Sequence, residues 1–252
     1  MPSSTSDTGI RTTAEAAVRA ANRYPRRMSV APDDPRPELP IPRGLVFAAS
    51  GWIAASWVIA IGVQPPLQPS SAVYTPAARM LLASMVIGGL VAWPLFRLST
   101  GRIRRPIARA LLDLATLVAL FQIVIWPLRL VTSWPADRTL LLDLHGIAWL
   151  ASVAAVLAWA AARGGGARVW TMILIMVWLV VPPVLVITLG LSGDLAKISP
   201  LFEVWSIASD GPAEIAPGDW RRVAIEFAVA AVIWWAAIAT STAGEESADS
   251  VA

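Results

Sequence analysis

The chain has 252 residues, of which 56% are hydrophobic and only 15% are charged. Soluble domains carry about 25% charged residues, so this deficit indicates that lipid surrounds most of the chain. Cysteine is absent, which excludes disulfides, thiolate metal sites and cysteine nucleophiles. The 13 tryptophans suit a protein with many membrane–water boundaries, where indole rings favour the headgroup level.

Residues 1–43 predict a disordered cytoplasmic tail. They contain Ser, Thr, Asp, Arg and Pro, without the apolar core that a secretory signal needs. Residues 12–24 can form a short helix, but its apolar face is mainly alanine and therefore weak for binding a membrane surface. The prolines from Pro32 to Pro42 then predict an extended spacer before the first apolar segment.

Six apolar segments follow the tail, and each is close to the roughly 20 residues that a spanning helix needs. Each is bounded by proline, glycine or charge, as helix ends are. We place them at residues 44–63, 78–96, 108–132, 139–162, 169–191 and 222–240. The sequence thus predicts an all-α fold, a polytopic membrane helix bundle of six transmembrane helices over residues 44–240.

Arginine distribution predicts the orientation of the bundle. Arginines precede the first segment, fill the loop after the second, and flank the glycine turn at 164–166. With six spans these regions share one side, which the positive-inside rule makes cytoplasmic. Both termini, including a C-terminal tail over residues 241–252, are therefore expected in the cytoplasm of a multi-pass protein in the cell inner membrane. Because the arginines lie beside apolar runs, we expect the lipid bilayer and not nucleic acid as their partner.

Small and cyclic residues predict where the helices approach one another or bend. Gly51 in the first segment, and Gly88 and Gly89 in the second, would let a neighbouring helix come close. Pro182 and Pro183 lie inside the fifth segment and should kink it.

The largest outer segment, residues 192–219, is too long for a simple turn. Its middle has the pattern of a short amphipathic helix, with Ser199 as the cap and Pro200 at the first helical position. Two interpretations stay open at this point. The helix lies on the membrane surface, or it forms part of a re-entrant hairpin that lines a pathway.

Five ionisable residues fall at a similar depth from the outer helix ends: Arg79, Arg129, Asp143, His145 and Glu226. Each ionisable group costs roughly 2.5–3.5 kcal/mol at the centre of a membrane helix. Arg129 and Asp143 flank a tight hairpin and are expected to pair. Either these charges pair or snorkel and only fix the helix register, or they face a cavity and handle a proton or an anionic group. In the second case His145 is the natural titrating residue.

Two other polar residues have simpler expected partners. Asp113 should pair with Arg109, four residues earlier on the same helix. Gln122, in the middle of the third segment, should form a hydrogen bond across a helix interface.

Catalytic and cofactor motifs are missing from the sequence. There is no GxxxxGK[ST] phosphate loop, no HExxH and no GxSxG elbow. A single histidine without cysteine cannot complete a metal or haem site. We therefore predict no catalytic, cofactor-binding or metal-binding residues, and no enzyme.

The segment that begins Ser199–Pro200, followed by Leu201 and Phe202, resembles the Ser-Pro-apolar start common in ABC-2-type transporter permeases. The layout of residues 44–240 is also similar to those membrane subunits, which have six spans, cytoplasmic termini and short re-entrant helices between the fifth and sixth spans. The resemblance implies a separately encoded ATPase and two permease copies around one translocation path.

Three functional hypotheses follow from the sequence. The first is a permease-like subunit of a membrane transport system that acts with a separate ATPase. The alternative is a non-catalytic membrane scaffold or assembly protein, whose polar layer only locks the helices. The third is a proton-coupled or redox-chain membrane protein that uses His145.

Overall fold

The structure is a computed structural model that describes residues 42–62, 70–99, 105–163, 165–190, 193–209 and 215–249. All regular elements within these residues are helices, and six of them are long and apolar enough to cross a membrane. The predicted all-α fold with six spans is therefore confirmed. Of the tail predicted over residues 1–43, residues 1–41, with the short helix, lie outside the described residues, and Arg43 already belongs to the first helix.

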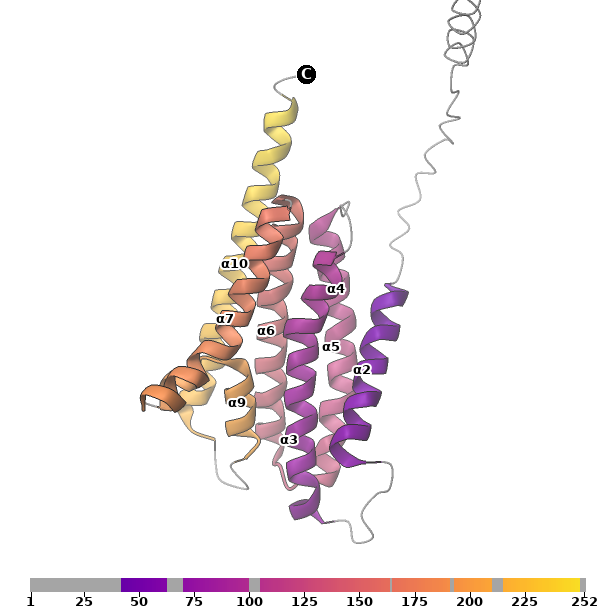
Figure 1. Ribbon diagram of the computed structural model, residues 1–252, viewed down its shortest axis with the longest axis vertical. Helices are drawn as coiled ribbons and strands as arrows, with labels where there is room; N and C mark the ends of the chain where they lie inside the picture. Colours follow the sequence, from indigo (N-terminus) through magenta and orange to yellow (C-terminus); the bar gives the residue numbers. More distant parts are fainter. Residues whose placement is uncertain are drawn as a thin grey trace, which may run out of the picture. The chain divides into compact units, whose positions relative to one another are not determined.

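The first three spans run in alternating directions along the bundle (Figure 1). They are α2 (Arg43–Ile61), the composite Tyr74–Ser99, and α5 (Pro106–Val131). The composite span joins α3 (Ser71–Ile87), a π-helical turn η1 (Gly88–Ala92) and α4 (Trp93–Ser99).

The remaining spans are α6 (Ala136–Arg163), α7 (Gly165–Leu189) and the first part of α10 (Pro217–Asp249). Two short helices, α8 (Gly193–Ala196) and α9 (Pro200–Ile207), lie between α7 and α10 in the chain. Helix α10 continues beyond the predicted end of the sixth span at 240, because the following residues include alanine and glutamate and no proline. Much of the predicted C-terminal tail is thus helical.

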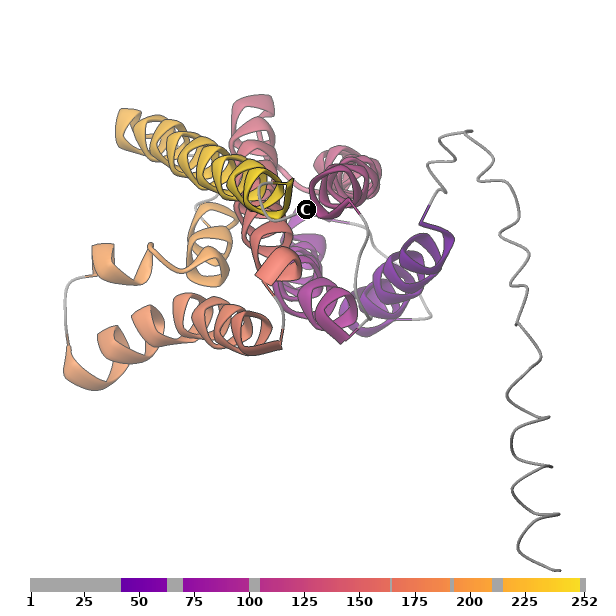
Figure 2. The ribbon, with the colours of Figure 1, turned by 90° about the horizontal axis from the view of Figure 1, so that it is seen from above.

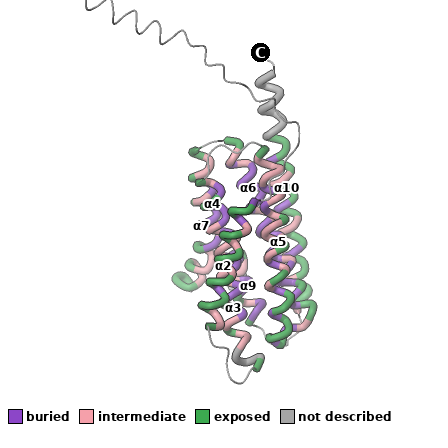
Figure 3. The backbone as a smooth tube through the Cα atoms, turned by 90° about the vertical axis from the view of Figure 1, so that its right-hand side faces the viewer, coloured by how far each residue is buried: buried purple, intermediate pink, exposed green. Residues whose placement is uncertain are grey.

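Helix α6 is the centre of the bundle, with α5 and α10 packed along it (Figure 2). Within the most apolar 18-residue stretch of each span, 72% of the residues are buried in α6, compared with 11% in α2 and in α7. Exposed residues follow the outer faces of the helices, whereas buried residues concentrate inside (Figure 3). Polar side chains of α6 are therefore removed from lipid and must find partners on neighbouring helices.

The close approaches predicted at the glycines of the second span are confirmed. A Cβ on Gly88 would lie 2.6 Å from Trp52 Nε1 on α2, and one on Gly89 would lie 2.7 Å from Leu150 Cδ2 on α6. The same Trp52 nitrogen donates a hydrogen bond to the carbonyl of Ser84 at 3.0 Å. Gly51, in contrast, has nothing within 4 Å among the described residues.

A third glycine, Gly146, sets the spacing of α5 and α6. A Cβ there would lie 2.7 Å from two ring carbons of Phe121. We expect Gly146→Ala to destabilise the protein by about 1 kcal/mol, because the methyl group forces the ring or the helix to move. Thermal unfolding in detergent would measure this loss. Gly51→Ala is the matched control and should leave the midpoint unchanged, and an equal effect of both substitutions would contradict the argument.

Helix α7 contains the proline pair predicted to kink it, and its later part swings away from the bundle (Figure 1). In an α-helix the carbonyl of Leu179 would accept a hydrogen bond from residue 183, but Pro183 has no N–H. The hydroxyl of Ser199 donates to this carbonyl instead, at 2.6 Å. Trp178 Nε1 adds a bond to the carbonyl of Ile198 at 2.9 Å. The start of α9 is thus fastened to the interior of α7.

The helix predicted within residues 192–219 is confirmed as α9, with Ser199 preceding it and Pro200 at its first position. The predicted side-chain cap by Ser199 is absent, because its hydroxyl donates a hydrogen bond to the Leu179 carbonyl of α7. Helix α9 packs against α3, α6 and α7, and it buries Glu203 and Val204. It is therefore part of the helix bundle.

Candidate functional site

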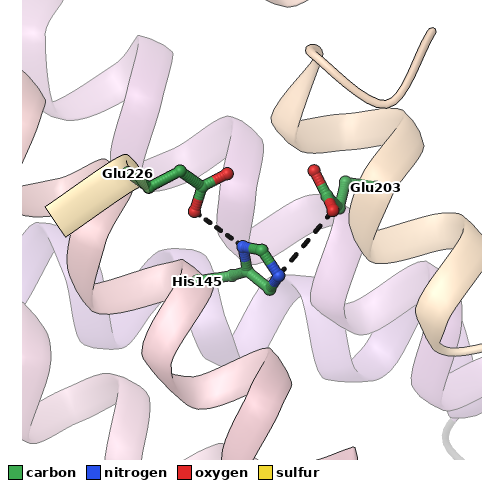
Figure 4. A group of neighbouring side chains, drawn as sticks. All are labelled: His145, Glu203 and Glu226. Carbon is green, nitrogen blue, oxygen red and sulfur yellow. Dashed lines mark hydrogen bonds and ion pairs between the residues drawn. The ribbon is translucent and has the colours of Figure 1, made fainter. Parts of the chain in front are cut away.

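Four ionisable side chains from α6, α9 and α10 meet at the central helix. His145 of α6 is fully buried, with its Nδ1 2.6 Å from Glu226 Oε2 of α10. Its Nε2 lies 3.7 Å from Glu203 Oε1 of α9, and Arg222 donates to that same oxygen at 2.8 Å. Figure 4 shows the imidazole between the two carboxylates, with one ring nitrogen toward each. We call His145, Glu203, Arg222 and Glu226 the His145 cluster.

Local sequence explains how each helix presents its member of the cluster. Arg222 and Glu226 are four residues apart and therefore share one face of α10. Glu203 is the single acidic residue in α9, whose start is held by the Ser199 bond to α7. The ring of His145 stacks on that of Trp149, one turn further along α6, with centroids 5.2 Å apart.

The His145 cluster carries an imbalance of charge. With a neutral imidazole, its two carboxylates and one guanidinium leave one negative charge, and a proton on His145 makes the cluster neutral. Two of its buried atoms, His145 Nε2 and Glu203 Oε2, have no hydrogen-bond partner. Glu203 lies outside the six spans. Burial raises the pKa of its carboxyl, although attraction to His145 and Arg222 opposes the rise.

The raised pKa of Glu203 makes stability depend on pH. The folded state binds this proton more tightly than the unfolded state, so the stabilising contribution is present below the ordinary value of 4.5 and is lost as the pH rises through the folded-state pKa. We therefore expect the unfolding temperature of the wild type, relative to Glu203→Gln, to fall as the pH is raised from 4 toward 8. Asp137→Asn, at an exposed carboxylate, controls for the general effect of pH. A difference that stays constant over this range would contradict the prediction.

The structure brings together only two of the five residues predicted as a polar layer, His145 and Glu226. Arg79 of α3 instead packs against α9, with its guanidinium carbon 4.0 Å from the centroid of the Trp205 ring and a bond to the Trp205 carbonyl at 3.5 Å. Arg129 is exposed on α5. The sequence interpretation missed Glu203 and Arg222. Two features of the sequence could have indicated them. Glu203 is the one acidic residue in an otherwise largely apolar helix, and Arg222 lies four residues before Glu226.

The predicted pair of Arg129 and Asp143 is wrong. Asp143 accepts two bonds from Gln122 Nε2, at 2.7 and 2.8 Å. Arg129 lies two residues before the end of α5, whereas Asp143 lies seven residues after the start of α6, a difference of five residues or about 7.5 Å in depth. The predicted bond of Gln122 across a helix interface is confirmed, since it joins α5 to α6.

A second buried charge pair connects α4 to α5. Asp113 is bound by two nitrogens of the Arg97 guanidinium and lies 3.5 Å from Trp93 Nε1. The predicted pairing with Arg109 is confirmed at 3.8 Å, but the arginine four residues away is the more distant partner. This pair joins α4 to the start of α5, the next helix in the chain.

The donor set of the cluster fits a proton better than a metal ion. Potential ligand atoms of His145, Glu203 and Glu226 lie within 4.8 Å of one another. However, the two ring nitrogens face different carboxylates, and the Arg222 guanidinium already binds Glu203 Oε1. A metal at Nε2 would thus have fewer than the three protein ligands of a catalytic zinc site.

A groove of about 580 Å³ lies beside the cluster, between α6, α7 and α10. Arg222, Glu226 and Lys197 contribute charged groups to its lining, which is otherwise largely apolar. The side chain of Glu226 is 18% exposed while that of His145 is 0% exposed. Glu226 therefore connects the buried imidazole to the groove.

Comparison of the chain with protein-family models, with curated proteins and with solved structures finds no significant match. The fold and the site together define an integral, multi-pass membrane protein with a buried charged cluster on its central helix.

Proposed function

We propose that this chain is a non-enzymatic, permease-like subunit of a membrane transport system and that it acts with a separate ATPase. The observation that carries the proposal is the placement of α9. This short helix comes between the fifth and sixth spans, packs against three other helices, and is bonded to the interior of α7. The resemblance to ABC-2-type permeases implies short re-entrant helices at this point of the chain, and the position of α9 supports that expectation.

Two further features support this proposal. In the most apolar stretch of α2 and of α7 only 11% of the residues are buried, which leaves surface for lipid and for a second copy of the chain. At the end expected in the cytoplasm, the Arg97–Asp113 pair holds α4 beside α5, and Arg105 is exposed just before α5. An acidic surface of an ATPase would be attracted to Arg105 and to the arginines that precede it in the sequence.

Affinity purification in mild detergent tests the proposal. We expect a nucleotide-hydrolysing subunit to be recovered with the chain, and we expect Arg105→Glu, at the exposed arginine just before α5, to weaken its recovery. Arg221→Glu, an exposed arginine at the start of α10, is the matched control and should have no effect. Repeated recovery of the chain alone from its native membrane would contradict the proposal.

A scaffold or assembly role is the second candidate, and the internal pairing of polar groups favours it. Asp143 with Gln122, and Asp113 with Arg97, are contacts that lock helices together. In a scaffold, Asp143→Ala should lower the unfolding temperature and the yield of bound partners in parallel. A selective loss of transport with normal unfolding would reject the scaffold.

A further inference from the structure

We propose that His145, Glu203 and Glu226 form a proton-binding site in which the proton lies between His145 Nε2 and Glu203 and draws α9 onto α6. This inference goes beyond the transport function proposed above and does not require an ATPase.

Hydrogen bonding at the imidazole defines where the proton binds. With Glu226 ionised, the 2.6 Å contact between Nδ1 and Glu226 Oε2 places a hydrogen on Nδ1, because an ionised carboxylate can only accept. A neutral ring has one N–H, so its Nε2 then presents a lone pair to Glu203 Oε1, which also presents lone pairs. Both Nε2 and Glu203 Oε2 are buried without a hydrogen-bond partner. One added proton converts this repulsion into an ion pair.

Charge balance favours the same proton. Uncompensated charge in a low-dielectric interior is costly, and when His145 is neutral Arg222 is the cation bonded within the cluster, at Glu203 Oε1. Other charged groups near α6 have partners or positions of their own. Asp113 binds Arg97 and Arg109, and Asp143 of α6 binds Gln122. Arg129 is exposed on α5, Arg168 is in the first turn of α7, and Lys197 lines the groove and has a contact of its own. Arg79, on α3, lies over Trp205 of α9.

Uptake of the proton has a mechanical consequence. The 3.7 Å separation between Nε2 and Oε1 is too long for a hydrogen bond, whereas a charge-assisted N–H···O bond is about 2.8 Å. Closing it moves Glu203, and with it α9, by about 1 Å toward α6. In the proton transfer, hydronium from the groove becomes water and the imidazole becomes imidazolium, with no other bond made or broken. Release of the proton reverses the movement.

His145 can be observed directly because it is the only histidine of the chain. With ¹⁵N-labelled histidine and an affinity tag that contains none, nuclear magnetic resonance reports this ring alone. We expect both ring nitrogens to carry hydrogen at low pH and one of them to lose it at a single midpoint. Glu203→Gln and Glu226→Gln should each lower this midpoint by about one pH unit, a roughly tenfold loss of proton affinity.

Asp137→Asn, which removes an exposed carboxylate from the same helix, should shift the midpoint far less. A folded protein whose ring stays in one neutral tautomer from pH 4 to 9 would overturn the proposal. Equal midpoints in the wild type, Glu203→Gln and Glu226→Gln would also overturn it.

The absence of cysteine allows the movement of α9 to be measured separately. Ala208 at the end of α9 is fully buried, and the neighbouring Ser209 is exposed. We expect maleimide to label Ala208→Cys, relative to Ser209→Cys, several-fold faster above the His145 midpoint than below it. The ratio corrects for ionisation of the thiol itself. His145→Gln should abolish this pH dependence. A pH-independent ratio in the protein that keeps His145 would show that the proton does not move α9.

Discussion

Replacing Asp113 by alanine is expected to destabilise the protein by about 3–5 kcal/mol, the usual cost of removing one partner from a buried ion pair. The carboxylate is 2% exposed and is bound by two nitrogens of Arg97, a residue that is itself 8% exposed. Alanine removes the acceptor of both bonds while the guanidinium stays enclosed between α4 and α5. Thermal or denaturant unfolding in detergent would measure the loss.

Two variants separate the ion pair from its surroundings. Arg109→Ala removes the more distant and more exposed arginine, so it should cost at most about 1 kcal/mol. Replacing Arg97 and Asp113 together by methionine and leucine should recover most of the lost stability, because no buried charge is then left unbalanced. A loss below about 1 kcal/mol in Asp113→Ala would mean that solvent reaches the pair.

The same residue illustrates how far the sequence can predict these contacts. The partner four residues away, Arg109, follows from helical periodicity. The stronger partner, Arg97, lies on the preceding span, and its position depends on how two helices pack and rotate. Span positions depend on hydrophobicity summed over about 20 residues and were therefore predicted well.

The depth of a residue along its helix and the rotation of that helix also explain the other differences between the predicted and the observed contacts at the site. Arg129 and Asp143 flank the same hairpin, yet their distances from its turn differ by five residues. Glu203 lies outside the spans, in the short helix α9, whose placement depends on a bond between Ser199 and α7. Neither pattern is visible in one helix considered by itself, whereas His145 and Glu226 were predicted at one depth from the helix ends.

The bond between Ser199 and Leu179 leads to the second large effect. Ser199→Ala is expected to cost about 1–3 kcal/mol, because the carbonyl of the buried Leu179 loses its hydrogen-bond donor while Pro183 offers no N–H. Pro183→Ala supplies that missing N–H from within α7. In this background Ser199→Ala should cost clearly less, with an interaction energy of about 1 kcal/mol in a double-mutant cycle measured by unfolding in detergent.

Pro182→Ala is the matched control, because its new N–H faces the carbonyl of Trp178 and leaves that of Leu179 unchanged. Ser199→Ala should therefore cost the same in this background as in the wild type. Strictly additive costs for Pro183→Ala and Ser199→Ala would show that the missing proline N–H does not account for the attachment of α9. A coupling confined to Pro183 would instead mean that the kink in α7 creates the acceptor that holds α9, and with it Glu203, against the central helix.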